Sequence, residues 1–163
     1  MENENEAKRQ ELIKFSKTLI RIPYRRGAKP RTPAEFESLN GEEIREADCS
    51  SFTAYIYWKA LKIILPPSTI LQATSEQGRI VSLREAEPGD LVFFHGEKGY
   101  YDFTKLPGRY IGHVAILGFD GFEATIIHAV NSGGKSGVVE HPFTAEEHPM
   151  YCPKNIVLIK QLI

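Results

Sequence analysis

Apolar residues recur at helical spacing in the first half of the chain and at strand spacing in the second. Between Glu6 and Arg21 a stripe of large apolar side chains repeats every three or four residues, which predicts an amphipathic helix. Residues 1–5 are polar and acidic, and we expect them to be frayed or disordered. Pro23 ends this helix, and the stretch from 24 to 40, which contains proline and glycine, is predicted to be a long ordered loop.

The second predicted helix is the most apolar and aromatic stretch of the chain and runs from about residue 48 to about residue 64. Asp48 or Ser50 can serve as its N-cap, because either side chain can accept a hydrogen bond from an N–H group of the first helical turn. The helix is expected to end ahead of Pro66, since proline disfavours helix at the residue before it.

A short third helix, capped by Ser68 or Thr69, is expected before Gly78, and beyond this glycine the apolar period changes to two. Short strands are predicted at 79–81, 91–94, 113–118, 124–130, 137–141 and 155–161. Helices that come first and strands that follow indicate an α+β fold with an antiparallel sheet.

Length, composition and charge are those of an ordinary globular domain. A chain of 163 residues fits one domain spanning 1–163, which we expect to be a monomer. The net charge of −1 gives no reason to expect a nucleic-acid or membrane partner. The acidic amino terminus lacks the basic start and apolar stretch of a secretory signal. We therefore expect a cytoplasmic protein, one exported by a non-classical route, or part of a longer product.

Cys49 is the first candidate for chemistry, because it falls in the first turn of the apolar helix. The positive end of a helix dipole favours thiolate over thiol, and a thiolate is a nucleophile. The alternative is that Cys49 is one more small residue buried at a helix start. With Cys152 as the only other cysteine, a disulfide framework is not expected.

Two histidines flank a predicted hairpin. Asp-Gly between apolar runs is a strong signal for a two-residue turn, here Asp120 and Gly121. This turn would pair Phe119 with Phe122 and, further along the strands, His113 with His128. Paired residues point to the same face of a sheet, with Cβ atoms about 4.5–5.5 Å apart. The alternative is that both histidines are half-buried residues of a strand edge.

Together the three residues suit nucleophilic catalysis, with Cys49 as nucleophile, His113 as base and His128 as the group that orients the base. No cofactor or metal is needed for this chemistry. A competing metal site would combine His113 and His128 with His95 or Asp90. Neither an H-E-x-x-H motif nor paired C-x-x-C motifs support a closed zinc site.

Five stretches in this order resemble the NlpC-type cell-wall cysteine peptidases, a branch of the papain-like enzymes, over residues 6 to 139. They are Ile22-Pro23-Tyr24-Arg25-Arg26-Gly27, Asp48-Cys49-Ser50-Ser51-Phe52, Pro88-Gly89-Asp90-Leu91-Val92-Phe93-Phe94, Gly112-His113-Val114-Ala115-Ile116 and Ile127-His128-Ala129. The resemblance implies a papain-like fold in which the nucleophile begins a helix packed on an antiparallel sheet. It also implies the same three roles for Cys49, His113 and His128.

The resemblance further implies a peptide substrate. The substrate would come from peptidoglycan stem peptides, with γ-D-glutamyl-diamino acid bonds as one candidate, and its hydrolysis would pass through a thioester. Asp48 and Ser50 would help to hold a free amino end, and Tyr24 would lie near the reacting carbonyl. Their alternative roles are a helix cap for Asp48 and Ser50 and a core aromatic for Tyr24.

The sequence departs from the family pattern at several places. Ser51 stands where a glycine is usual, and Pro67 stands where an arginine associated with a substrate carboxylate is frequent. Arg84, Lys98 or Arg109 are candidates to replace this charge, and the segment 95–112 is longer than usual.

A lipid acyltransferase and an inactive binding module are the alternative functions. Lipid acyltransferases of the superfamily place histidine before cysteine, which is the opposite of the order here. A binding module that retains the fold without activity is a further alternative, although an intact Cys-His-His set argues against it. His141, His148 and Cys152 are interpreted as structural or solvent-exposed residues.

Overall fold

The structure is a computed structural model that describes residues 2–96 and 110–163. In these residues the helices α1 (Glu2–Thr18), α2 (Pro33–Glu37), α3 (Cys49–Leu61) and α4 (Thr69–Thr74) precede the strands. The strands are β1 (Arg79–Val81), β2 (Leu91–His95), β3 (Ile111–Asp120), β4 (Glu123–Ser132), β5 (Lys135–Pro142) and β6 (Ile156–Gln161), with a short 3-10 helix, η1 (Pro153–Asn155), before β6.

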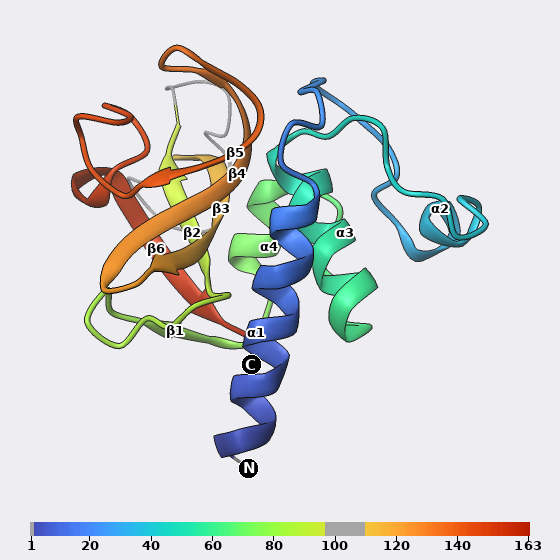
Figure 1. Cartoon of the computed structure of the whole chain (residues 1–163), viewed down its shortest axis with the longest axis horizontal. Coiled ribbons are helices and arrows are strands. Elements are labelled where there is room, and N and C mark those ends of the chain that lie inside the picture. Colours follow the sequence, from blue (N-terminus) through green and yellow to red (C-terminus); the bar gives the residue numbers. More distant parts are fainter. Residues whose placement is uncertain (1, 97–109) are drawn as a thin grey trace.

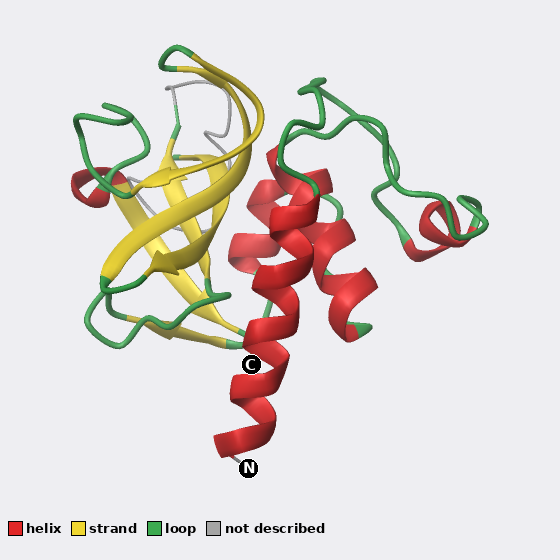
Figure 2. Ribbon diagram, in the orientation of Figure 1, coloured by secondary structure: helices red, strands yellow, loops and turns green. Residues whose placement is uncertain are grey.

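The strands form one antiparallel sheet in the order β1-β6-β2-β3-β4-β5. Helices α1, α3 and α4 lie along one side of this sheet, while the segment that carries α2 projects away from it (Figure 1). The α-helices and the strands thus occupy separate regions of the molecule, whereas the short helix η1 lies beside the strands (Figure 2). This is the α+β fold with an antiparallel sheet that the sequence predicts.

Helix α1 lies earlier in the chain than predicted. It begins at Glu2, so residues 2–5 are helical rather than frayed, and an ion pair of 2.6 Å between Lys8 and Glu4 supports this first part. It ends at Thr18, and the backbone N–H of Arg21 then donates to the β5 carbonyl of Val138 at 2.9 Å. The chain leaves α1 early because its next residues pair with the edge of the sheet.

Helix α2 was not predicted, because the proline- and glycine-containing stretch around it was interpreted as loop. Thr32 caps it, accepting a hydrogen bond from the Glu35 backbone N–H, and the Glu35 side chain accepts in return from the Thr32 N–H. Pro33 takes the first helical position, where its fixed φ suits a helix. The sequence Thr-Pro-Ala-Glu therefore carried a helix-start signal that could have been recognised.

The core consists of two clusters, one on each face of the sheet. Leu91 and Phe93 belong to the cluster beneath the helices, whereas Val92 and Phe94 belong to the cluster on the opposite face. Successive side chains of a strand point to opposite faces, so this alternation follows from the strand itself. By the same alternation His113 and His128 share the face of the second cluster.

The β3–β4 hairpin forms, but in a different register from the predicted one. Asp120 pairs with Glu123 and Phe119 with Ala124, so the turn consists of Gly121 and Phe122. Gly121 has φ +61° in the first central position, where a type II′ turn requires glycine. The slip is two residues, which is one full strand period, so His113 and His128 still share a face.

Two glycines close the base of the segment that follows β2. A Cβ atom on Gly112 would lie 2.4 Å from the Gly96 Cα, and one on Gly96 would lie 2.6 Å from the Gly112 Cα. Real Cβ atoms do not approach a backbone atom this closely, so both positions require glycine. Residues 97–109, which include most of the long segment noted above, lie outside the described residues.

We expect Gly112→Ala to destabilise the protein by roughly 1–3 kcal/mol, because the backbone of Gly96 cannot move without disturbing β2. Gly121→Ala is the matched control, since its Cβ would meet nothing within 4 Å and only the positive φ opposes it. Urea unfolding of the two variants gives the comparison. Equal stabilities would mean that the two glycines need not approach closely.

Candidate active site

Cys49 is the first residue of α3, and Asp48 caps the helix in front of it. The Asp48 Oδ1 accepts from the Ser51 backbone N–H at 2.9 Å, and the Asp48 N–H donates to the Ser51 Oγ at 2.9 Å. This reciprocal capping box decides between the two predicted caps in favour of Asp48. It also gives Ser51, which replaces the usual glycine, a structural role at the helix start.

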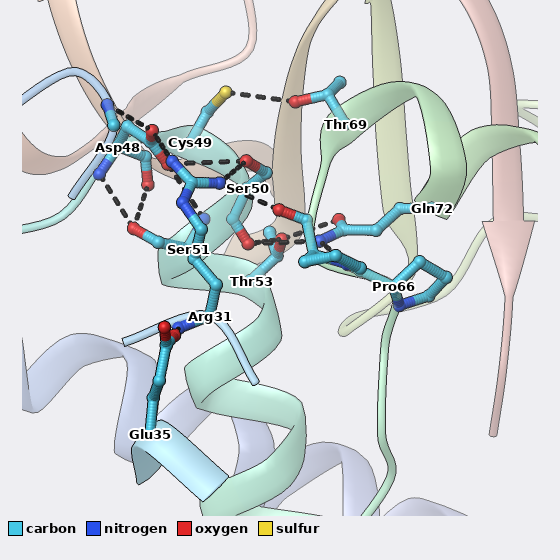
Figure 3. Close-up of polar contacts among 12 residues, drawn as sticks. Arg31, Glu35, Asp48, Cys49, Ser50, Ser51, Thr53, Pro66, Thr69 and Gln72 are labelled. Atoms are coloured by element: carbon cyan, nitrogen blue, oxygen red, sulfur yellow. Dashed lines mark hydrogen bonds and ion pairs between the residues drawn. The ribbon is translucent and has the colours of Figure 1, made fainter. Parts of the chain in front are cut away.

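The Cys49 thiol lies half-buried in a cleft, 3.4 Å from the Thr69 hydroxyl of α4 (Figure 3). Burial raises its pKa above the ordinary value, while hydrogen bonding by the Thr69 hydroxyl and the backbone of Val114 lowers it by smaller amounts. The negative charge of Asp48 raises it further. The free protein therefore holds a thiol, and our expectation that the helix start would favour thiolate is wrong.

His113 and His128 lie in contact, as predicted. Their rings are joined by a hydrogen bond of 2.7 Å between His113 Nε2 and His128 Nδ1. His128 is fully buried, and His113 borders the cleft that also contains Cys49. Val114, the next residue of β3, approaches the Cys49 sulfur, so the candidate base and the candidate nucleophile are held by one strand and the helix beside it.

The hydrogen bonding continues to a third histidine. His128 Nε2 lies 2.9 Å from His141 Nε2, and His141 Nδ1 lies 2.9 Å from the carbonyl oxygen of Pro142. His141 is buried within β5, so it is a structural rather than a solvent-exposed residue, and its contact with the site was not predicted. The residue lies 13 positions from His128, and the signal that could have connected the two is the Gly133-Gly134 pair, which forms the turn between β4 and β5.

His148 and Tyr151 complete an aromatic wall beside these rings. The Tyr151 ring stacks on His113 with centroids 3.8 Å apart and on His148 with centroids 4.4 Å apart. His148 is fully buried, and its Nδ1 accepts from the backbone N–H groups of Met150 and Tyr151, each at 3.2 Å. Its Nε2 therefore carries the proton and donates to the Ser132 hydroxyl at 3.1 Å.

All four rings resist protonation. Burial lowers the pKa of His113 to about 3, with further lowering by the neighbouring His148 and His141. Burial also lowers the pKa of His128 well below its usual range, followed by the effect of His113. The pKa values of His141 and His148 are lowered by burial as well. At neutral pH the cluster is uncharged.

The cleft has a volume of about 590 Å³, and Tyr24 lines it together with Cys49 and His113. Tyr24 pairs with Ala47 in a short parallel bridge, which brings the early loop beside the start of α3. Burial raises the pKa of the Tyr24 phenol, and the negative charge of Asp48 raises it further. The phenol is therefore a hydrogen-bond donor at neutral pH.

Arg31 is a cleft residue that the sequence did not single out. Its guanidinium forms an ion pair with the Asp48 carboxylate and donates to the Ser50 Oγ at 2.9 Å (Figure 3). It also donates to the Pro67 carbonyl at 2.8 Å. The Asp48 Oδ2 also accepts from the Gly27 N–H at 2.9 Å. Asp48 and Ser50 thus lie at the cleft as expected, but both already have a cationic partner.

None of the three residues predicted to replace the missing arginine is a described residue of the cleft. Lys98 and Arg109 lie outside the described residues, and Arg84 is not among the described residues that line the cleft. Arg31 instead places its guanidinium beside Pro67, the residue found in place of the usual arginine. This approach joins residues 36 positions apart and could not be read from the sequence.

Asp90, a ligand of the competing metal site, has other partners in the structure. Asp90, one proposed metal ligand, is bound to Arg9 of α1 at 2.9 Å and lies buried. Within residues 2–96 and 110–163, no group of three histidine, cysteine or acidic side chains is arranged to hold a metal ion. Over the same residues, no helix is long and apolar enough to cross a membrane.

Comparison with protein families gives the assignment. A model of the NlpC/P60 family matches residues 23–141. This range contains the three candidate catalytic residues and the candidate substrate-binding residues Tyr24, Asp48 and Ser50. The chain belongs to the NlpC/P60 family. No curated protein matches it.

Solved NlpC/P60 structures share the fold at low sequence identity. A Staphylococcus aureus protein, described as similar to a lipoprotein of the NLP/P60 family, is 21% identical with a TM-score of 0.62. The match covers 96% of this chain and 42% of the Staphylococcus aureus chain. The peptidoglycan hydrolase RipB of Mycobacterium tuberculosis is 18% identical with a TM-score of 0.64, covering 97% and 66%. This chain therefore spans less than half of the first protein and about two thirds of the second.

A third relative is described as non-catalytic. RipD of Mycobacterium tuberculosis, described as adapted to peptidoglycan binding, is 15% identical with a TM-score of 0.61, covering 96% of this chain and 98% of its own. The papain-like α+β fold of this NlpC/P60 domain is thus shared by hydrolases and by a binding protein. Activity must be inferred from its own residues.

We expect the stability of this NlpC/P60 domain to fall as the pH falls from about 6.5 towards 3. Unfolded histidine titrates near 6.5, whereas folded His113 has a pKa of about 3, so between these values the unfolded chain binds more protons. Urea unfolding across this range measures the effect. His113→Gln removes one such group and should give a shallower slope. An unchanged slope in this variant would mean that His113 is not protected from protonation.

Proposed function

We propose that this NlpC/P60 domain is a cysteine peptidase that hydrolyses amide bonds of peptidoglycan stem peptides. The observation that carries the proposal is the shared cleft of Cys49 and His113, with His113 hydrogen-bonded to His128 at 2.7 Å. A nucleophile beside a base, with the base held by a third polar residue, is the arrangement that acyl transfer requires.

The reaction would begin from a neutral pair, since burial favours the uncharged form of both Cys49 and His113. As the sulfur attacks the amide carbonyl, His113 takes the thiol proton and a carbon–sulfur bond forms. The carbon–nitrogen bond then breaks, and the leaving amine takes that proton. Water, deprotonated by His113, attacks the thioester and releases a carboxylic acid and the free thiol.

Tyr24 is proposed to stabilise the oxygen that becomes negative during attack. Its phenol stays protonated because burial raises its pKa, and it borders the same cleft as Cys49. A protonated donor aimed at a developing oxyanion contributes only when charge appears, which is how a residue lowers the barrier rather than merely binding substrate.

We expect Cys49→Ala to abolish hydrolysis of muropeptides and free stem peptides, because Cys49 is the only cysteine among the described residues that line the cleft and only a cysteine can form the thioester. Mass spectrometry of the digests would show the cleaved bond, with γ-D-glutamyl-diamino acid bonds among the candidates. Cys152→Ala is the matched control, since this buried thiol does not line the cleft. Its activity should be retained, and a chelator should have no effect on the unaltered protein.

Turnover by Cys49→Ala would refute the nucleophile, and loss of activity with chelator would favour metal chemistry. Binding of muropeptides without cleavage by the unaltered protein would support the binding-module alternative instead. The non-catalytic description of RipD makes this a defined second candidate.

Asp48 and Ser50 are proposed to border the amino side of the scissile bond. The sequence led us to expect a free substrate amino group at the Asp48 carboxylate. Because Arg31 already supplies a cation there, a substrate ammonium would add a second positive charge to one carboxylate. We therefore propose that the preference for a free amino end is weak and that Arg31 weakens it.

We expect the unaltered protein to cleave free and amino-acetylated peptides with kcat/KM values within about tenfold, a difference of ~1.4 kcal/mol. Arg31→Gln should increase the relative rate on free peptides, because it leaves Asp48 without its cation. Arg26→Gln is the control, as a second arginine of the cleft. A strong preference for free peptides that Arg31→Gln does not change would contradict this role.

A further inference from the structure

We propose that His141 is a positioning residue whose ring sets the tautomers of His128 and His113 and leaves His113 Nδ1 free as the base. The effect of this role on the reaction rate rests on the proposed function. Its effect on the positions of the ring protons does not depend on that function, so the two effects can be tested separately.

The fixed point is the carbonyl oxygen of Pro142, 2.9 Å from His141 Nδ1. A carbonyl oxygen can only accept a hydrogen bond, so His141 Nδ1 must carry the proton. A neutral imidazole has one N–H and one bare nitrogen, and therefore His141 Nε2 is bare and can only accept. The position of this ring within β5 thus decides its tautomer.

The same reasoning passes along the next two hydrogen bonds. His128 Nε2, 2.9 Å from the bare nitrogen of His141, must donate, which leaves His128 Nδ1 bare. His113 Nε2, 2.7 Å from that bare nitrogen, must also donate. His113 Nδ1 is then the unprotonated nitrogen. Three rings are placed in one tautomeric order by one backbone oxygen.

Neutral rings are a condition for this order, and burial supplies it. His128 is fully buried, and His113 and His141 are 4% and 5% exposed. Their pKa values all lie below the usual value, so at neutral pH each ring has a single proton to place. Without an acceptor at position 141, no such order is imposed on His128.

In that case His128 can carry its proton on Nδ1 instead. That nitrogen would then donate to His113 Nε2, and His113 would have to hold its own proton on Nδ1. The base of the proposed reaction would be lost although Cys49, His113 and His128 were all present. His141 therefore acts through His128 and does not itself touch the substrate.

The experiment is ¹⁵N NMR of the histidine rings at neutral pH in the Cys49→Ala protein, which needs no turnover. We expect His113 protonated on Nε2, His128 on Nε2 and His141 on Nδ1. Added to this background, His141→Leu should shift the His128 and His113 protons towards Nδ1, and His141→Gln, which keeps an acceptor, should restore the original pattern.

With Cys49 present, His141→Leu should lower kcat by at least about tenfold with little change in KM, and His141→Gln should recover most of it. His148→Gln is the matched control for the NMR measurement. It removes another buried ring, but one bonded to Ser132 and backbone N–H groups rather than to His128. Its His128 tautomer should be unchanged.

A proton on His113 Nδ1 in the Cys49→Ala protein would overturn the inference without any substitution at position 141. So would His141→Leu with unchanged ring tautomers and unchanged kcat. If His141→Leu fails to fold, the pattern of the parent protein and of His141→Gln still decides. The expected ring pattern without any hydrolysis would contradict the proposed function and support the inference.

Discussion

The Asp48 carboxylate is the point on which the site depends. It caps α3 immediately before Cys49, accepts the Gly27 amide of the early loop and forms an ion pair with Arg31. Hydrogen bonds to a buried carboxylate are stronger than those between neutral groups. One side chain therefore fixes the start of the helix, the loop that carries Tyr24 and one wall of the cleft. The candidate nucleophile takes its position from this cap rather than from the cleft itself.

The parts of the site that could be predicted are those encoded locally. The apolar helical stretch, with Asp48 or Ser50 as candidate caps, was enough to place Cys49 at a first turn, and the capping box between Asp48 and Ser51 is what starts the helix there. Two histidines predicted to face each other across a hairpin still share a face of the sheet if the true register differs from the predicted one by an even number of residues. The predicted turn lay one residue too early, which shifted every pairing by two, and the contact survived because two is the period of a strand.

The parts that could not be predicted depend on contacts between distant segments. Arg31 reaches Pro67 and Asp48 because the early loop folds back over the start of α3, and no residue near Arg31 signals this. By contrast, His141 joins His128 through the pairing of β4 with β5, and the Gly133-Gly134 turn between these strands was a hairpin signal that could have been recognised. The pKa of Cys49 was misjudged for a related reason. A helix start can be read locally, whereas burial is set by the whole fold and here outweighs it.

Burial of the histidines has a consequence for how a base can be oriented. A carboxylate in place of His128 would orient His113 at the cost of placing a charge in a fully buried position. A row of neutral, hydrogen-bonded rings avoids that cost. Each ring can carry its proton on either nitrogen, however, unless a group outside the row fixes the choice. The Pro142 carbonyl decides, because it neither titrates nor donates. The fold thus orients the proposed base without a buried charge. The direction of all the hydrogen bonds between the rings depends on one acceptor, which belongs to the backbone.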